Sequence, residues 1–383
     1  MARRSSRGSA DDESEYAKVR EEAETTKIRY SASKVAAVVG LHEFGNPVED
    51  FMEILYQDLE ELLEIDAKLL GMKVVSKYNE MKSLIQKSGA RKILNDIVKW
   101  THDKSTTARV GKANSLSRDA INHINAARKR KRLTEDEAKL LQESITTKVR
   151  QSVGKRNENL ALQMYEAQNG LQVESTNDKF YFLLFPHPKQ AKAVASSSSP
   201  PQCSCYEAKR MEDLIERFEM DKNSDGPAPQ GHYFSICGMI DGVADVLTID
   251  DDDVWSTERI LVEVKNRMAR FKNPTPLHDC IQMAVYMKMI GVRQGDMVQC
   301  LHHDKTVIQV ARVSLDEYPL SSSAGQCPRR CSTDLWTSVI VPRLYEYSGA
   351  IYKLRGQDMR RLAFLQAAPD EQLKILRDLV SFV

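Results

Sequence analysis

The sequence predicts an α/β fold, in which helices flank a central mixed β-sheet and a helical insertion interrupts the chain. Two observations predict this fold class. Short apolar runs with strand character occur at three places, Phe180–Phe185, Tyr233–Ile240 and Ile260–Lys265. Apolar side chains also recur at helical spacing in residues 48–90, 154–169 and 278–291. We therefore expect helices to cover a sheet.

Length, composition and charge limit the class of protein. The 383 residues suit one enlarged domain or two, and a hydrophobic content of 42% is enough for a core. The formal net charge of +1 means that any nucleic-acid surface would have to be a local patch. No apolar run approaches the about 18 residues that a membrane helix needs, and no secretory segment is visible. We expect an intracellular protein with no membrane partner.

The first residues change from basic to acidic. Met1–Arg7 starts like a transit peptide, but Asp11, Asp12 and Glu13 count against that role. We expect residues 1–25 to form a disordered tail, and residues 26–383 to form one domain.

A capped helix is predicted near residue 31. The segment Tyr30–Leu41 has serine before an apolar run and Gly40 after most of it. Because helix N-termini bind anions, Ser31, Ser33 and the nearby Arg29 are candidate phosphate ligands. Helix capping is the simpler role for the two serines.

Residues 51–150 are predicted to form the helical insertion. Thr134–Glu137 is a capping-box sequence that opens one of its helices. Just before the box stands a basic run, Arg128, Lys129, Arg130, Lys131 and Arg132. Such a run can bind phosphate backbone, act as a nuclear localisation signal or form a solvated helix face.

Residues 187–231 are predicted to form a flexible loop, because Ala193–Gln202 is low-complexity sequence rich in serine and proline. The chain has 7 cysteines, and two pairs lie close in sequence, Cys203 with Cys205 and Cys327 with Cys331. Neither pair has the Cys-x-x-Cys spacing of a metal site. We expect the cysteines of an intracellular protein to be reduced.

Acidic side chains occur at or near the ends of two predicted strands. Asp241 lies in the sequence Gly-Met-Ile-Asp-Gly, and the next strand carries Glu263 and Lys265. Because side chains two apart on a strand share a face, Glu263 and Lys265 point the same way. An aspartate, a glutamate and a lysine that converge at strand ends can hold Mg²⁺ and steer a water. Asp245 is a second candidate for the aspartate of this site. We prefer Asp241, because Gly242 after it lets the backbone turn close to a metal.

Two helices near these strands carry further candidates. Glu158 lies on a predicted helix that begins near Gly154 and ends at Asn169-Gly170. Residues 278–291 form an amphipathic helix in which Gln282 and Tyr286 are neighbours, four residues apart. Read more simply, Glu158 is an exposed helix glutamate and the second helix covers the sheet.

The order Asp241, then Glu263-x-Lys265, resembles the signature of the PD-(D/E)XK nuclease superfamily. The helices of Glu158 and Gln282 and the Ser-Ala-Ser segment are similar to the lambda exonuclease and YqaJ-like branch. This resemblance implies a restriction-endonuclease-like core, and it covers residues 28–50, 150–185 and 232–315. Two features depart from the family pattern: the long gap from Asp to Glu, which contains Asp250–Asp253, and the helical insertion.

The resemblance also implies roles for individual residues. The ligands of a Mg²⁺ or Mn²⁺ ion would be Asp241, Glu263, the Val264 backbone carbonyl and Glu158. Lys265 would hold the attacking water and help to deprotonate it, and Gln282 would orient the array. Ser31, Ser33 and Arg29 would approach a terminal phosphate.

The expected function is a metal-dependent deoxyribonuclease that acts from DNA ends in recombination, repair or genome maintenance. Three alternatives stay open: a structure-specific endonuclease, an inactive nuclease-like DNA-binding or scaffold protein, and salt-sensitive nucleic-acid binding through the basic run. The resemblance allows a homo-oligomer. The basic run favours the nucleus slightly over the mitochondrion or the cytoplasm.

Overall fold

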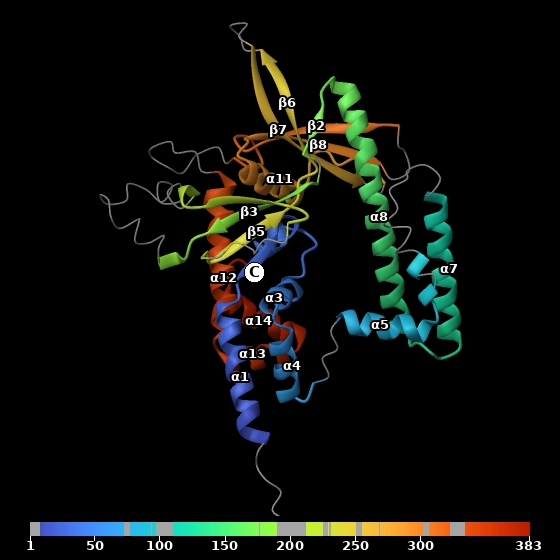
Figure 1. The fold of residues 1–383 in the computed structure, drawn as a ribbon, viewed down its shortest axis with the longest axis vertical. Coiled ribbons are helices and arrows are strands. Elements are labelled where there is room, and N and C mark those ends of the chain that lie inside the picture. The colour runs from blue at the N-terminus through green and yellow to red at the C-terminus, as the bar shows by residue number, and fades with distance from the viewer. Residues whose placement is uncertain are drawn as a thin grey trace, which may run out of the picture.

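The computed structural model describes most of the chain, and Figure 1 shows its arrangement. The described residues are 8–72, 77–92, 94–96, 110–175, 177–189, 212–224, 229, 231–249, 255–267, 269–301, 306–321 and 334–383. The four cysteines that are close in sequence, Cys203, Cys205, Cys327 and Cys331, lie outside these ranges.

The strands form two mixed sheets. The first has the order β1-β5-β3-β4, with β1 parallel to β5 and the other pairs antiparallel. The second has the order β2-β6-β7-β8-β9, with only β7 and β8 parallel. The strands of the first sheet are β1 (Ile28–Ser31), β3 (Lys179–Phe185), β4 (Glu216–Asp221) and β5 (Phe234–Gly238). Those of the second are β2 (Val173–Glu174), β6 (Gly242–Ile249), β7 (Trp255–Arg267), β8 (Gln294–Leu301) and β9 (Ile308–Ser314).

Helices surround the two sheets. Those before the first long strand are α1 (Gly8–Thr25), η1 (Ala32–Lys34), α2 (Val35–Val38), α3 (Pro47–Leu55), α4 (Glu60–Leu69), α5 (Lys77–Ser88), α7 (Val110–Lys129) and α8 (Glu135–Asn169). Those that follow are α11 (Leu277–Ile290), η2 (Trp336–Ile340), α12 (Val341–Arg355), α13 (Asp358–Gln366) and α14 (Pro369–Leu379). The predicted α/β class with flanking helices is confirmed, but the chain builds two mixed sheets where we expected one. The short β2 joins the second sheet early in the chain, and the main crossing from the first sheet to the second falls between β5 and β6.

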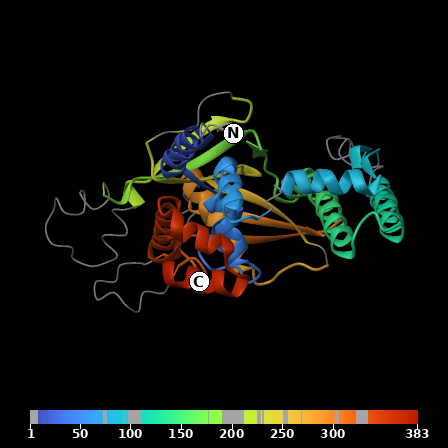
Figure 2. The same ribbon diagram turned by 90° about the horizontal axis from the view of Figure 1, so that it is seen from below.

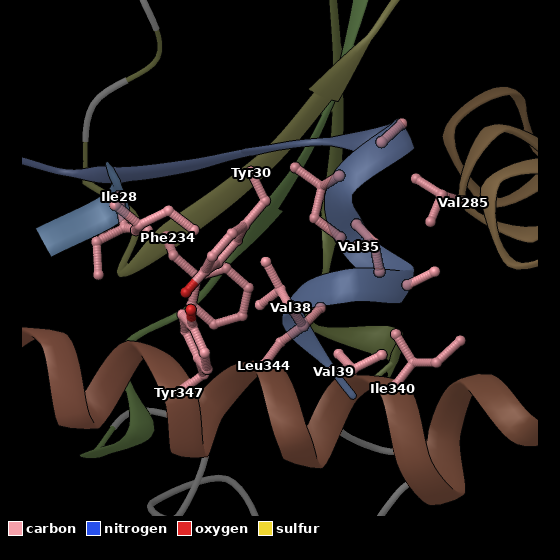
Figure 3. Close-up of a cluster of buried hydrophobic side chains, with 14 of the residues drawn as sticks. Ile28, Tyr30, Val35, Val38, Val39, Phe234, Val285, Ile340, Leu344 and Tyr347 are labelled. Carbon is pink, nitrogen blue, oxygen red and sulfur yellow. The ribbon is translucent and has the colours of Figure 1, made fainter. Parts of the chain in front are cut away.

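Helix α11 joins the two sheets, because it contacts strands of both. Its side chains belong to the main apolar core, together with those of β1, α2, α3 and α12. Figure 3 shows part of this core, where Tyr30 and Phe234 meet Leu344 and Tyr347 of α12. On the other side of the second sheet, Ala161, Leu162 and Tyr165 of α8 pack against β7 and β8 in a separate cluster. The second sheet therefore lies between α11 and the end of α8.

The predicted disordered tail is wrong from Gly8 onward, because residues 8–25 form α1. Val19 and Ala23 are buried in the main core, and Arg20 forms an ion pair with Asp358 at 3.2 Å. The sequence shows only a weak apolar stripe there, so contacts with α4 and α12 specify this helix.

The helical insertion is smaller than predicted. Phe51 and Leu55 of α3 and Leu62 of α4 are buried in the main core, so both helices belong to the body. A separate cluster unites α5, α7 and the first half of α8, with Leu84, Ile124 and Leu141 among its buried residues. We call these three segments the helical arm. Figures 1 and 2 show it to one side of the body.

The helix of the capping box and the helix of Glu158, which we expected to be separate, are one continuous helix, α8. Thr134 and Glu137 form the predicted capping box at its start, and Gly170 ends it in the left-handed region at φ 65°. Gly154, expected near a helix start, lies in its interior, where a single glycine is tolerated.

The predicted loop 187–231 contains a strand. β4 pairs with β3 from Lys179–Asp221 to Leu184–Glu216, and most of its residues are exposed, as expected for an edge strand. Residues 190–211, with the Ser- and Pro-rich segment, lie outside the described part. None of the described helices is both long and apolar enough to cross a bilayer.

Candidate active site

Side chains from α8, the β5–β6 turn, β7 and α11 meet at the junction of the two sheets. They are the five predicted catalytic residues, Glu158, Asp241, Glu263, Lys265 and Gln282. Hydrogen bonds or charge interactions link each of them to at least one other. The segments that supply them are far apart in the sequence, so this meeting depends on the fold.

Asp241 lies in the turn between β5 and β6, next to the last third of β7. Its Oδ2 accepts a hydrogen bond of 2.7 Å from the backbone N–H of Val264. Burial, followed by the charge of the neighbouring Glu158, raises the pKa of Asp241 to about 7. Val264 thus contributes an amide donor that fixes this carboxyl, and the predicted use of its carbonyl as a metal ligand stays a prediction.

Asn177 holds Glu158 beside Asp241, a role that sequence reasoning missed. Its Nδ2 donates to Glu158 Oε1 at 2.6 Å, and its backbone N–H donates to the carbonyl of Ile240 at 3.1 Å. Its φ of 51° is in the left-handed region, which asparagine adopts more readily than most residues. The Asn-Asp pair at residues 177–178 was the available signal, because this pair is typical of tight turns.

Glu263, Lys265 and Gln282 form a closed hydrogen-bonded triangle. Lys265 Nζ donates to Glu263 Oε1 at 2.9 Å and to Gln282 Oε1 at 2.6 Å. Gln282 Nε2 donates back to Glu263 Oε1 at 3.2 Å, and also to the Tyr286 hydroxyl at 3.2 Å. The predicted shared face of the two β7 residues and the predicted pair on α11 are both found here.

One oxygen of Glu263 has no partner in the described structure. The residue is 3% exposed, and its Oε2 is buried without a hydrogen bond. Burial, and then the charge of Asp241 against the opposing effect of Lys265, raises the pKa of Glu263 to about 8. A buried acceptor without a donor is costly, so this atom is suited to a ligand that carries positive charge.

The ammonium of Lys265 stays charged although it is buried. Burial lowers its pKa, but the charge and hydrogen bond of Glu263 outweigh burial, so the net shift is upward. The lysine supplies one positive charge against three carboxyl groups.

Close packing leaves no room for a side chain at Gly238, next to this site. A Cβ there would lie 2.6 Å from Tyr286 Cε1 and 3.1 Å from Ala32 Cβ. The absence of a side chain at Gly238 leaves room for the ring of Tyr286, whose hydroxyl accepts a hydrogen bond from Gln282 on the same helix.

Asp245, the competing aspartate, is not part of the cluster. It is exposed on β6 and pairs with Arg259 across the strand, at 3.0 Å. The preference for Asp241 over Asp245 therefore agrees with the geometry.

The three candidate phosphate residues lie on or just after β1. Ser31 pairs in register with Cys237, one residue before Gly238, so it lies near the catalytic cluster. Its hydroxyl is 3.3 Å from that of Ser33 and does not cap the following helix. The expected capped helix is only the short η1 and α2, so its dipole adds little for an anion.

Arg29 lies two residues before Ser31 on β1. It lines a cavity of about 400 Å³ that Lys27, His232 and Ser235 also line. Its guanidinium pairs with Asp58. Both ring nitrogens of His232 are buried and without partners in the described structure. The cavity therefore gathers cationic and unpaired polar groups at the edge of the first sheet.

The basic run lies on the helical arm, away from the cluster in sequence and in fold. Arg128 and Lys129 end α7, and residues 130–132 form the turn into α8. Arg128 pairs with Glu135. The other four side chains of the run are without ion pairs in the described structure, so they are available for anions.

Comparisons with protein-family models, with curated proteins and with solved structures found no match. Within the described residues, no three His, Cys, Asp or Glu side chains are arranged as a ready metal-binding group. The carboxylates of the site face Asn177, the Val264 amide and Lys265 instead.

Proposed function

We propose that the protein is a metal-dependent deoxyribonuclease, and that it acts from DNA ends. The observation that carries this proposal is the unpartnered Oε2 of Glu263 in a cluster of three carboxyl groups and one lysine. Carboxylates that lie close together in a buried site raise each other's pKa. A divalent cation among them would relieve both the repulsion and the missing hydrogen bond.

The side chains present fit a hard cation. Asp241, Glu263 and Glu158 offer carboxylate oxygens, the donors that Mg²⁺ and Mn²⁺ prefer, and the Val264 carbonyl would add a fourth oxygen. When bound, such an ion makes a water more acidic and offsets negative charge on a phosphate.

Lys265 and Gln282 would act on the reacting groups. The charged Lys265 ammonium would hold the attacking water and offset charge that develops on the phosphate. Gln282 accepts from Lys265 and donates to Glu263, so it keeps both side chains in one orientation. Tyr286 and Asn177 would serve as positioning residues for Gln282 and Glu158.

The preference for DNA ends rests on the edge of the first sheet. Ser31 and Ser33 lie close to the cluster, and Arg29 and Lys27 line the cavity beyond them. Cations and hydroxyl donors beside the cluster suit a terminal phosphate. The basic run on the helical arm would bind the backbone of the same DNA.

The test uses end-labelled linear DNA and closed circular DNA, with Mg²⁺, Mn²⁺ or EDTA. Wild type should degrade linear DNA only when the ion is present. Lys265→Ala should lower that rate by about 10²–10³-fold, the cost of losing one group that stabilises developing charge. Arg259→Ala, on the exposed part of the same strand, should leave the rate unchanged.

Other outcomes identify the alternatives. Cutting of the closed circle would indicate an endonuclease. DNA binding without cleavage under either ion would refute the enzyme and favour a nuclease-like binding or scaffold protein.

A further inference from the structure

A cavity of about 740 Å³ lies beside the candidate active site, and the proposed roles make no use of it. It opens between the β7–α11 connection, the end of β9 and the residues after α2. Its lining includes Phe44, Lys272, His278, Arg312, Val313 and Tyr318. This volume is within the range of binding sites for small organic groups.

The cavity adjoins the two elements that carry the catalytic candidates. Arg267, on its wall, follows Lys265 by two residues on β7, so both lie on one face of that strand. His278, also on its wall, precedes Gln282 by one turn on α11. The cavity therefore begins two residues after Lys265 on β7 and one turn before Gln282 on α11.

Hydrogen bonds hold the wall in place. The side chain of Gln299 accepts from the Lys272 N–H and donates to the Lys272 carbonyl, both at 3.0 Å. It also accepts from Arg267 at 2.8 Å, and Arg267 donates to Asp279 at 2.7 Å. The cavity is thus preformed by contacts between β7, β8, the connecting loop and α11.

Two aromatic rings at the cavity are exposed without evident structural reason. Phe44 is 81% exposed and Tyr318 is 89% exposed. Rings of this size are normally at least half-buried, and exposed apolar groups beside a cavity mark binding surfaces. The ring centroids of His278 and His42 lie 4.3 Å apart at a tilt of 37°, and His42 meets Phe44 edge to face at 6.1 Å. Aromatic groups therefore lead from the turn of α11 before Gln282 to the cavity.

The charges at the cavity are mixed. Lys272 is exposed, and its ammonium has no ion pair in the described structure. Arg312 pairs with Asp296, and Glu43 and Glu317 also line the cavity. Burial lowers the pKa of His278 and so favours its uncharged imidazole. This pattern suits a planar ring with a single phosphate better than a long polyanion.

We propose that this cavity holds an unpaired nucleotide of single-stranded DNA, with its base against the rings of Phe44 and Tyr318 and its phosphate near Lys272. Aromatic side chains bind unpaired bases by stacking, with little regard to sequence. The inference rests on the proposed function. It predicts that ends with a single-stranded overhang are bound in preference to blunt ends.

The test measures binding in EDTA, so it does not depend on cleavage. Fluorescence anisotropy compares a labelled oligothymidylate with a blunt duplex. Wild type should bind the single strand more tightly, and Phe44→Ala or Tyr318→Ala should each weaken that binding about tenfold. Tyr318→Phe should keep wild-type affinity, because the ring remains. Met359→Ala on α13, which removes another exposed side chain (82%), should have no effect.

Equal affinity of wild type and the Phe44→Ala/Tyr318→Ala double variant for the oligothymidylate would overturn the proposal. Equal affinity of wild type for the single strand and the blunt duplex would also overturn it. The failure of the nuclease proposal is distinguishable, because wild type would then leave all DNA uncut while the binding differences persisted. If both proposals hold, the double variant should cut overhang and blunt substrates at equal rates.

Discussion

The body of the molecule and the helical arm differ in where they place their charged groups. The body buries charged groups at the junction of two sheets, where Asp241 and Glu263 have strongly raised pKa values. The arm has a small apolar cluster of its own and exposes a basic turn. Buried groups with strongly shifted pKa values are typical of catalytic sites. Exposed positive charge is typical of surfaces that bind a polyanion. Under the proposed function, the reaction would take place in the body, and the arm would bind DNA.

Helix α8 connects the two regions. Its first half supplies Ala138, Leu141 and Ile145 to the cluster of the arm, and its second half carries Glu158. The Tyr165 hydroxyl anchors that second half to Asp296 of β8 at 2.6 Å. Within the described residues, α8 therefore joins the arm to the site as one continuous helix, which is fixed beyond Glu158.

The largest expected effect tests whether the arm folds separately. Ile124→Ala in the arm and Ile281→Ala in the body both empty fully buried positions and should each cost about 2–5 kcal/mol. Ile124→Ala should create an early unfolding transition of the arm and leave the transition of the body in place. Calorimetry with hydrogen exchange measures this, and a single transition that shifts as a whole would show that the regions fold as one unit.

The next effect concerns the carboxyl groups of the body. In the metal-free protein, Asp241 and Glu263 hold protons up to pH values of about 7 and about 8. A cation must displace those protons, so Mg²⁺ affinity should rise up to about tenfold per pH unit for each proton displaced, from pH 6 to 8. Titration calorimetry in buffers of different ionisation enthalpy should detect proton release on binding.

The same shifts affect stability, with the opposite sign to an ordinary ion-paired carboxylate. Because folding raises both pKa values, the folded state holds protons that the unfolded state has lost. The metal-free protein should therefore lose stability as pH rises from about 4 to 8. Asp241→Asn should flatten that loss, while Asp245→Asn should not. A metal affinity and a melting temperature that are both constant from pH 6 to 8 would contradict the assignment.

The smallest effect concerns the arm. Replacing Arg130, Lys131 and Arg132 by alanine should reduce the slope of log affinity against log salt by up to about 3 for duplex DNA. The rate at saturating DNA should stay the same, because the site is untouched. A matched control replaces three exposed cations of the C-terminal helices, Lys353, Arg360 and Lys374. An unchanged slope in the triple-alanine variant would show that the basic turn of the arm does not contact DNA.

Local patterns made much of the site predictable. Glu263 and Lys265 share a strand face because of the two-residue period, and Gln282 and Tyr286 share a helix face because of the turn. The capping box of α8 and its end at Gly170 also follow from short-range backbone chemistry. These features depend on neighbours within a few residues, so the sequence alone is enough to specify them.

Other features could not be predicted, because they depend on partners far away in the chain. The sequence by itself determined which side chains share a strand or helix face, where several elements begin and end, and which residues could bear the chemistry. Only the tertiary structure decided that the strands form two sheets, that α1 packs on the body and that Asn177 orients Glu158. It also decided the raised pKa values and the cavity beside α11, since burial and long-range contacts exist only after distant segments have met.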